Sequence, residues 1–194
     1  MSRLKVLDWT DTKEYYHRFI NLGPVLLGPK PAELLSFSGC NPEMSSKIAK
    51  LDRCFSICNK IKHRIFNYKN KGKKILIYNP SILDETLKEK RNFRFLKEIG
   101  YPEEYDLEIF LDQLINKFEK GELPPELGVF LGYPLKDVIG FIGHPSLKLT
   151  KIKGWRVYGD PRVSDKRYNE FLIAKDKVKD LLRSINPQQL LLVL

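Results

Sequence analysis

The sequence predicts an α+β fold: a single domain in which long amphipathic helices cover a mixed β-sheet of about five or six strands. Three observations support this prediction. The chain has 194 residues, 42% of them hydrophobic, which is enough apolar material for one buried core. Several long segments place apolar residues at helical spacing. Between them, short apolar runs end in an aromatic residue and a proline, which is typical of a strand followed by a helix. We therefore expect residues 1–194 to form one domain.

The N-terminal segment predicts one helix and then a strand. Thr10 or Asp11 can cap a helix that continues to about Leu22. Three prolines within residues 24–31 then remove backbone donors and fix φ, so we expect the helix to end before them. Residues 34–37 are the first expected strand.

The next segment allows two interpretations. Asn41 and Pro42 predict the start of a second helix, whose apolar face could continue through Ile61 and Ile65 as far as Phe66. Two β-prone runs flank Asn-Lys-Gly at residues 70–72, and this glycine can supply the positive φ of a hairpin turn. We therefore predict a β-hairpin over residues 63–78.

The middle of the chain predicts three helices and one central strand. Residues 81–99 have a helical pattern that stops at Gly100, and residues 102–119 have another. The run at residues 129–133 is entirely apolar and bounded by glycine and proline, so we expect a strand at the centre of the sheet. A short helix should follow over residues 135–142.

The C-terminal part predicts a hairpin, a long helix and an apolar tail. The hairpin is expected to turn at Lys153 and Gly154, and Asp160 and Pro161 should start the last long helix. Residues 186–194 are strongly apolar for a chain end. We expect this tail to pack on the domain or on a second copy of it, which would make an oligomer.

The net charge of +10 is concentrated in residues 47–74, which contain ten lysines and arginines but only one acid, Asp52. Such a block can attract nucleic acid or an acidic partner. The alternative is a solvated helix face followed by an edge strand that uses lysines against aggregation. A nucleic-acid-binding function would use Lys50, Arg53, Lys60, Arg64, Lys71, Lys73 and Lys74.

The pattern of aromatic residue and proline at the strand ends suggests a binding site. If the strands that end at Tyr78, Tyr133 and Tyr158 were parallel, three helix N-termini would open at one edge of the sheet and favour a phosphate or carboxylate. The alternative is that these motifs only mark the change from strand to helix. Our first hypothesis is a binding or regulatory protein with a polar-aromatic pocket for a small anionic ligand. The candidate ligand-binding residues are Lys30, Tyr78, Asn79, Tyr133, Trp155, Tyr158 and Asp160.

The sequence supports catalysis or a metal centre less strongly than ligand binding. Glu126 and His144 are the candidate acid–base residues, since one enters a buried segment after two prolines and the other follows a glycine in a loop. Cys54 and Cys58 are four residues apart, but no second pair of ligands completes a metal site, so we expect reduced thiols, no metal and no cofactor. An acid–base enzyme is the last of our three hypotheses.

The apolar stretches and the N-terminus of the sequence bear on where the protein is expected to reside. No apolar stretch reaches the roughly 20 residues that span a bilayer, and the N-terminus has no apolar core of a signal peptide. We expect a cytoplasmic protein with no membrane association.

Four strings carry a resemblance to a known family: KPAELLSF, ILIYNPSIL, ELGVFLGYPLKDVIGFI and GWRVYGDP. In order and spacing they resemble the bacterial family "domain of unknown function 3793" over about residues 21–182. The resemblance implies a small cytoplasmic bacterial protein with no established activity. It also implies that this chain lacks several cysteines and histidines of its relatives, which speaks against metal or thiol chemistry. These positions are Asn21, Leu22, Pro125 and the neighbourhood of Lys151 and Gly154.

Overall fold

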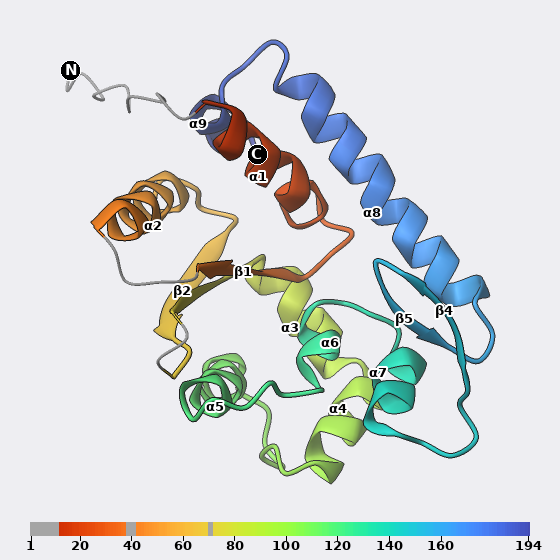
Figure 1. Cartoon of the computed structure of the whole chain (residues 1–194). Helices are drawn as coiled ribbons and strands as arrows, with labels where there is room; N and C mark the ends of the chain where they lie inside the picture. The colour runs from red at the N-terminus through yellow and green to blue at the C-terminus, as the bar shows by residue number, and fades with distance from the viewer. Residues whose placement is uncertain (1–11, 38–41, 70–71) are drawn as a thin grey trace.

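A central three-stranded antiparallel sheet divides the fold into two helical layers (Figure 1). The computed structural model describes residues 12–37, 42–69 and 72–194. The strands are β1 (Ala32–Phe37), β2 (Lys62–Asn67) and β3 (Lys73–Tyr78), in the order β1-β3-β2. Strand β3 is the most apolar of the three, which suits its place between two neighbours with both faces covered.

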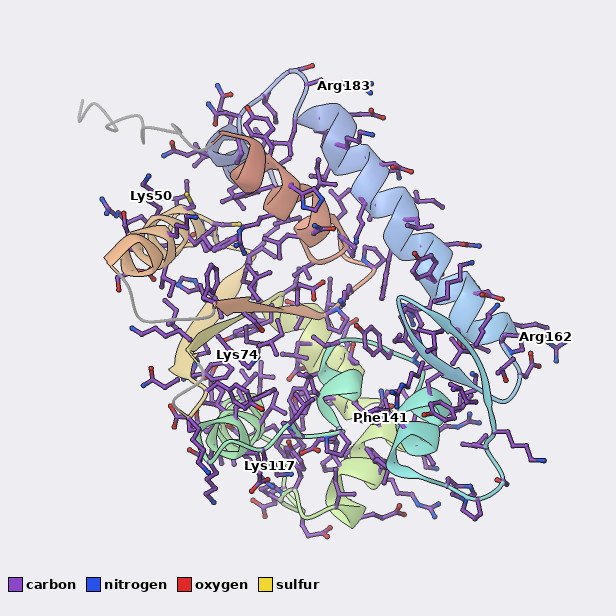
Figure 2. The ribbon with its side chains drawn as sticks, viewed as in Figure 1. Lys50, Lys74, Lys117, Phe141, Arg162 and Arg183 are labelled. Atoms are coloured by element: carbon purple, nitrogen blue, oxygen red, sulfur yellow. The ribbon has the colours of Figure 1, made fainter. Side chains whose placement is uncertain are left out.

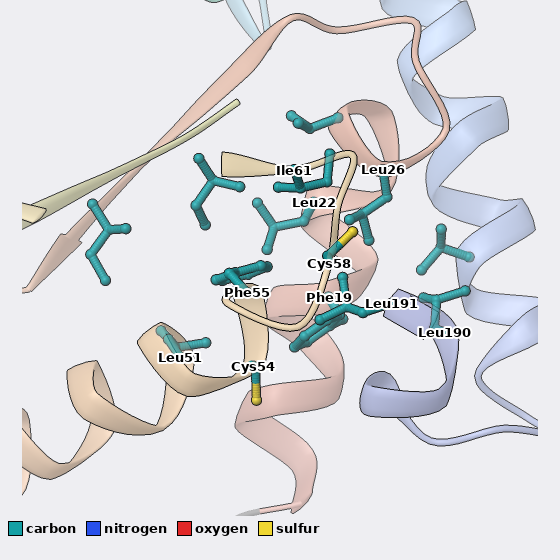
Figure 3. Close-up of a cluster of buried hydrophobic side chains, with 14 of the residues drawn as sticks. Phe19, Leu22, Leu26, Leu51, Cys54, Phe55, Cys58, Ile61, Leu190 and Leu191 are labelled. Carbon is teal, nitrogen blue, oxygen red and sulfur yellow. The ribbon is translucent and has the colours of Figure 1, made fainter. Parts of the chain in front are cut away.

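The alternation of side chains along β3 assigns each residue to one of two cores. Ile75 and Ile77 face a first core, and Leu76 and Tyr78 face a second core on the opposite side of the sheet. The first core is built by α1 (Thr12–Leu26), α2 (Pro42–Phe55), α9 (Pro187–Val193) and the end of α8 (Arg162–Leu181). Figure 3 shows Phe19, Phe55 and Leu190 in this layer.

The second core lies between the sheet and five shorter helices. These are α3 (Pro80–Lys88), α4 (Lys90–Glu98), α5 (Leu107–Glu119), α6 (Leu127–Phe130) and α7 (Leu135–Ile142). Aromatic rings dominate the contacts, including Tyr101 against Phe110 at 5.0 Å and Phe66 against Phe118 at 5.5 Å. Such ring pairs add to the stabilisation from apolar burial.

A second, two-stranded antiparallel sheet lies beside α7 and leads into α8. It consists of β4 (Leu149–Lys153) and β5 (Trp155–Tyr158), with Gly154 at positive φ in the turn. Helix α8 then runs back along α1 (Figure 1). Gly23 permits this close approach, since a Cβ there would lie 2.8 Å from the Ala174 carbonyl oxygen.

The structure confirms the predicted α+β class but not the predicted sheet. The described residues form two antiparallel sheets of three and two strands, where the sequence predicted one mixed sheet of five or six. Residues 129–133 are not a strand, because Leu127–Phe130 forms the short helix α6 and Gly132 closes it at positive φ. The run is apolar because α6 is buried in the second core, and periodicity alone cannot separate a buried strand from a buried helix turn.

Three helix boundaries also differ from the prediction. Helix α1 continues past Gly23 and Pro24 to Leu26, so the first proline lies in its last turn. The helix predicted over 81–99 is two helices, because the Glu89 side chain caps a new start at α4. The helix predicted from residue 102 begins at Leu107, where Asp106 caps it by accepting from the Ile109 N–H at 2.9 Å.

Both hairpins, the short helix at 135–142 and the last long helix lie where the sequence predicted them. The tail folds as α9, with Leu190 and Leu191 buried in the first core and Leu192 and Val193 exposed. The tail therefore packs on its own chain. The predicted caps Thr10, Asp11 and Asn41, and Asn70 and Lys71 of the predicted turn, lie outside the described residues.

Candidate functional site

Tyr133 is the centre of the candidate site, because it lines two neighbouring pockets. Gly132 at positive φ and Pro134 before α7 fix the backbone on either side of it. Its ring stacks on Trp155 at a centroid distance of 4.5 Å. Burial, together with the Glu33 carboxylate, raises the pKa of the Tyr133 hydroxyl to about 12, so this group keeps its proton at neutral pH.

Lys30 lies beneath Tyr133 and is almost fully buried, at 4% exposure. Its Nζ donates to Glu33 Oε2 at 2.8 Å and lies 5.3 Å from the centroid of the Tyr133 ring and 5.4 Å from that of Phe171. Burial lowers its pKa, and the Glu33 carboxylate partly offsets this effect. Lys30 therefore supports Tyr133 from below and does not present a free charge to solvent.

Asp137 connects α7, β5 and α8. Its Oδ2 accepts from Trp155 Nε1 at 2.8 Å and from Ser164 Oγ at 2.6 Å. Its Oδ1 accepts from the Tyr158 backbone N–H at 2.9 Å and from Lys136 Nζ at 2.6 Å. With four donors, this buried carboxylate has no free acceptor site for catalysis, and it holds Trp155 in place.

Lys136 and Gly140 complete the contact between α7 and β5. Lys136 Nζ also donates to the Tyr158 carbonyl at 2.7 Å and to Ser164 Oγ at 2.8 Å. Gly140 lies under the Tyr158 ring, where a Cβ would come within 2.7 Å of Cδ1. These contacts join the segment DVIGFI of α7 to the segment GWRVYGDP that contains β5.

The first of the two pockets is polar and has a volume of about 330 Å³. Arg91 at the start of α4 and Arg167 on α8 both line it. We call it the polar pocket; it is lined by Gly28, Pro29, Pro31, Ile82, Thr86, Glu89, Arg91, Asn92, Gly132, Tyr133, Pro134, Leu135, Val163 and Arg167. Three of the contributing helices, α3, α7 and α8, are those that begin after the aromatic–proline motifs.

The second pocket is mainly apolar and has a volume of about 340 Å³. Tyr133 and Trp155 form one wall, and Arg156 lies at its side. We call it the apolar pocket; it is lined by Leu123, Pro124, Pro125, Leu127, Gly128, Leu131, Tyr133, Asp137, Val138, Phe141, Trp155 and Arg156.

The prediction that three strands end at one edge of a single sheet is wrong. Some of the predicted ligand-binding residues nevertheless lie close together. Strands β3 and β5 belong to different antiparallel sheets, and Tyr133 ends no strand. Lys30, Tyr133, Trp155 and Tyr158 are connected through the contacts above, whereas Tyr78, Asn79 and Asp160 line neither the polar nor the apolar pocket.

The remaining three candidate ligand-binding residues have local contacts of their own. The buried Tyr78 interacts with Arg64, and burial raises the pKa of its hydroxyl. Asn79 caps α3, its side chain accepting from the Ile82 N–H at 3.3 Å. Asp160 is exposed, and hydrogen bonds from Arg162 lower its carboxyl pKa to about 2.

Neither of the two catalytic candidates lines the polar or the apolar pocket, although Pro125 and Leu127 on either side of Glu126 line the apolar one. Glu126 is buried, accepts from the Tyr101 hydroxyl at 3.1 Å and forms an ion pair with Lys117. Burial, aided by the Glu126 charge, raises the pKa of Tyr101. His144 is exposed, and its ring lies 2.9 Å from the Ser146 hydroxyl. The buried Glu126 thus neutralises the half-buried Lys117 beside the second core.

The basic segment does not gather on one face. Lys74 is buried beside Tyr68 and Phe118, and its Nζ donates to Ser36 Oγ at 2.8 Å. Arg64 forms ion pairs with Glu108 and Asp112. Figure 2 shows Lys50 on the outer side of α2, away from Lys74. Arg53, Lys60 and Lys73 are exposed, and Lys71 lies outside the described residues.

The described residues contain no group of three or more His, Cys, Asp or Glu side chains arranged to hold a metal. Cys54 and Cys58 are buried free thiols of the first core (Figure 3). Burial raises the Cys54 pKa to about 11. None of the described helices is both long and apolar enough to cross a membrane.

Sequence reasoning missed Arg91 and Arg167. Both residues belong to charged helical stretches that predict an ordinary solvated surface. They line the same pocket only because α4 and α8, far apart in the chain, meet the loop at residues 28–31. No local pattern carries this information.

The α+β fold and the strings that join α7 to β5 point to one family. The chain matches the family described as "Protein of unknown function (DUF3793)" over residues 19–191, and it belongs to that family. No curated protein matched the chain, and no solved structure did so either.

Proposed function

We propose that this protein binds a small anionic ligand, a phosphate or carboxylate compound, in the polar pocket. The observation that carries the proposal is the presence of two arginines, Arg91 and Arg167, in the lining of a single pocket of about 330 Å³. This volume lies within the range of small-molecule sites. Guanidinium groups match the geometry of phosphate and carboxylate oxygens, which they can bind through two parallel hydrogen bonds.

The charge balance of the polar pocket favours an anion. Arg91 makes no side-chain ion pair with any described residue. Arg167 donates to the Pro29 carbonyl at 3.2 Å and lies 3.4 Å from Glu170, and a guanidinium has five N–H donors, so some remain for a ligand. Glu89 is the acid of the lining, and its Oε2 already accepts from the Arg91 and Asn92 backbone N–H groups at 3.0 Å.

Neutral groups of the lining add hydrogen-bonding capacity. Asn92 Nδ2 donates to the Thr86 carbonyl at 2.8 Å, which orients the amide and leaves its second N–H as a donor. Tyr133 keeps its proton because its pKa is raised. A protonated tyrosine in the same pocket lining as two arginines can add a donor suited to an anionic oxygen.

The test is calorimetric titration with inorganic phosphate and pyrophosphate at low ionic strength. Arg91→Gln and Arg167→Gln should each weaken binding by about tenfold or more, since a hydrogen bond to a charged group contributes about 1.5–3 kcal/mol. Arg94→Gln is the matched control, because Arg94 lies on the same helix, pairs with Glu98 and does not line the pocket. Absence of binding, or equal weakening by Arg94→Gln, would contradict the proposal.

Thermal unfolding gives an independent readout of the same binding. A ligand at ten times its Kd stabilises the folded state by about 1.4 kcal/mol, and this raises the Tm by about 3–6 °C for a chain of this size. The melting temperatures of the unliganded variants show whether a substitution has damaged the fold.

The two alternative functions stay predictions. Nucleic-acid binding through the basic segment predicts affinity that falls steeply with salt, and charge reversal at Lys50 and Arg53 tests it. An acid–base enzyme would need Glu126 or His144 to reach a substrate. No contact of either residue favours that function over anion binding.

A further inference from the structure

The apolar pocket has features that the proposed anion site does not use. Its lining is mainly apolar, and two large apolar side chains line it while exposed to solvent: Leu123 is 61% exposed and Phe141 is 48% exposed. Phe141 lies on α7 beside the second sheet (Figure 2). Apolar groups that remain exposed around a concave apolar surface are typical of a binding site.

The pocket has a rigid aromatic wall. Trp155 is held by the bond from its Nε1 to Asp137, by stacking on Tyr133, and by Phe171 at a centroid distance of 5.9 Å. A ligand that enters therefore meets a surface already in place, which reduces the entropy lost on binding.

Of the charged side chains that line the apolar pocket, a positive one remains available to bind a ligand. Asp137 is the acid of the lining, and four donors occupy its oxygens. Arg156 is the cation, and its guanidinium carbon lies 5.6 Å from the Phe141 ring centroid. Arg156 is exposed and forms no ion pair with any described residue. A ligand with an apolar body and one acidic group would match both the walls and this arginine.

We infer that the apolar pocket is a second binding site, specific for small hydrophobic carboxylic acids, with the alkyl or aryl body against Trp155, Phe141 and Leu123 and the carboxylate on Arg156. The volume of about 340 Å³ suits a molecule of this size. This site is distinct from the polar pocket, and none of the substitutions used to test it affects Arg91 or Arg167.

Trp155 itself provides the measurement. The chain has two tryptophans, so Trp9→Phe leaves Trp155 as the single fluorescent indole. This protein is titrated with hexanoate, octanoate and decanoate, and with octanol as the uncharged match of octanoate. We expect a saturable change in Trp155 emission, with affinity rising about fourfold per added methylene while the chain still fits. Octanoate should bind more tightly than octanol.

Two variants locate the site, and a third is the control for the introduced glutamate. Arg156→Gln should remove the preference for octanoate over octanol by lowering octanoate affinity about tenfold, while octanol binding stays unchanged. Leu123→Glu should weaken octanoate by a similar factor through charge repulsion. Ile173→Glu is the control, since Ile173 is an exposed apolar residue of α8 that does not line the pocket.

Three outcomes would overturn the inference. The first is an emission that none of the acids changes. The second is that Arg156→Gln, Leu123→Glu and Ile173→Glu all bind octanoate with the same affinity, which would mean that octanoate binds outside the apolar pocket. The third is a sedimentation coefficient that rises with protein concentration and falls in Leu123→Glu, which would make this face a contact between copies of the chain.

Discussion

Replacement of Asp137 by asparagine should destabilise the protein strongly, although it changes only one atom. The carboxylate accepts hydrogen bonds from Trp155, Ser164, the Tyr158 backbone and Lys136. An asparagine keeps one acceptor oxygen and turns an NH₂ group toward the other two donors. The Ser164 hydroxyl can rotate to accept, but one buried donor stays unsatisfied.

The magnitude follows from these contacts. An unsatisfied buried donor costs about 1–3 kcal/mol, and the Lys136 ammonium loses its counter-charge, an effect that we discount because its side chain is 26% exposed. The expected loss in the free energy of unfolding is about 3 kcal/mol, which lowers the Tm by about 6–12 °C for a chain of this size.

Urea unfolding, followed by circular dichroism, measures this loss directly. The midpoint should fall while the m value stays constant, because the change removes stability without altering the surface exposed on unfolding. Asp180→Asn is the control, since the Asp180 side chain is 67% exposed and, among the described side chains, forms an ion pair only with Arg183. This substitution should lower the free energy of unfolding by less than about 0.5 kcal/mol. A loss for Asp137→Asn no larger than that of Asp180→Asn would refute the reasoning.

Four further predictions concern stability and reactivity. Glu126→Gln should cost about 1–3 kcal/mol in urea unfolding, because it leaves Lys117 without its counter-charge; a stabilised variant would contradict the ion-pair assignment. Tyr133 should make the protein less stable at alkaline pH. Its pKa is raised from 10.0 to about 12, so its contribution of about 3 kcal/mol is complete below pH 10 and is lost as the pH rises to 12. Tyr133→Phe should make the free energy of unfolding fall less steeply over this pH interval, while the other buried tyrosines with raised pKa values keep part of the slope; an unchanged slope would be evidence against the shift. In a Cys40→Ser background at pH 8, a thiol reagent should modify the buried Cys54 and Cys58 slowly in the native protein and quickly in guanidinium, whereas equal rates would show that the thiols are accessible. Gly140→Ala should cost at least about 1–3 kcal/mol in thermal unfolding, because a Cβ would collide with the Tyr158 ring; an unchanged Tm would mean that the ring moves aside freely.

Local signals in the sequence were enough to predict many elements of the fold. Gly72 and Gly154 have the positive φ expected of the two predicted hairpin turns. These features depend on neighbouring residues, so the sequence carries them directly. The strand predicted over residues 129–133 was wrong, because a short apolar run is equally suited to a buried strand and to a buried helical turn such as α6.

The candidate site was predictable only in part, because some of its residues come together only when distant segments pack in the fold. Tyr133 and Trp155 were found because they lie in recognisable motifs. Arg91 and Arg167 were missed because their partnership depends on how α4 and α8 meet in space. Lys30 was found, but its burial was not foreseen, since nothing in Gly-Pro-Lys-Pro shows that Glu33 and two aromatic rings will enclose its ammonium group.

The most direct test of the anion site is a crystal of the protein soaked with selenate or tungstate, whose anomalous scattering locates the ion. We expect a peak between the guanidinium groups of Arg91 and Arg167, within hydrogen-bond distance of both, and its loss in Arg167→Gln crystals treated in the same way. Anomalous peaks that occur only at other surface lysines and arginines, with none in the polar pocket, would contradict the proposed function.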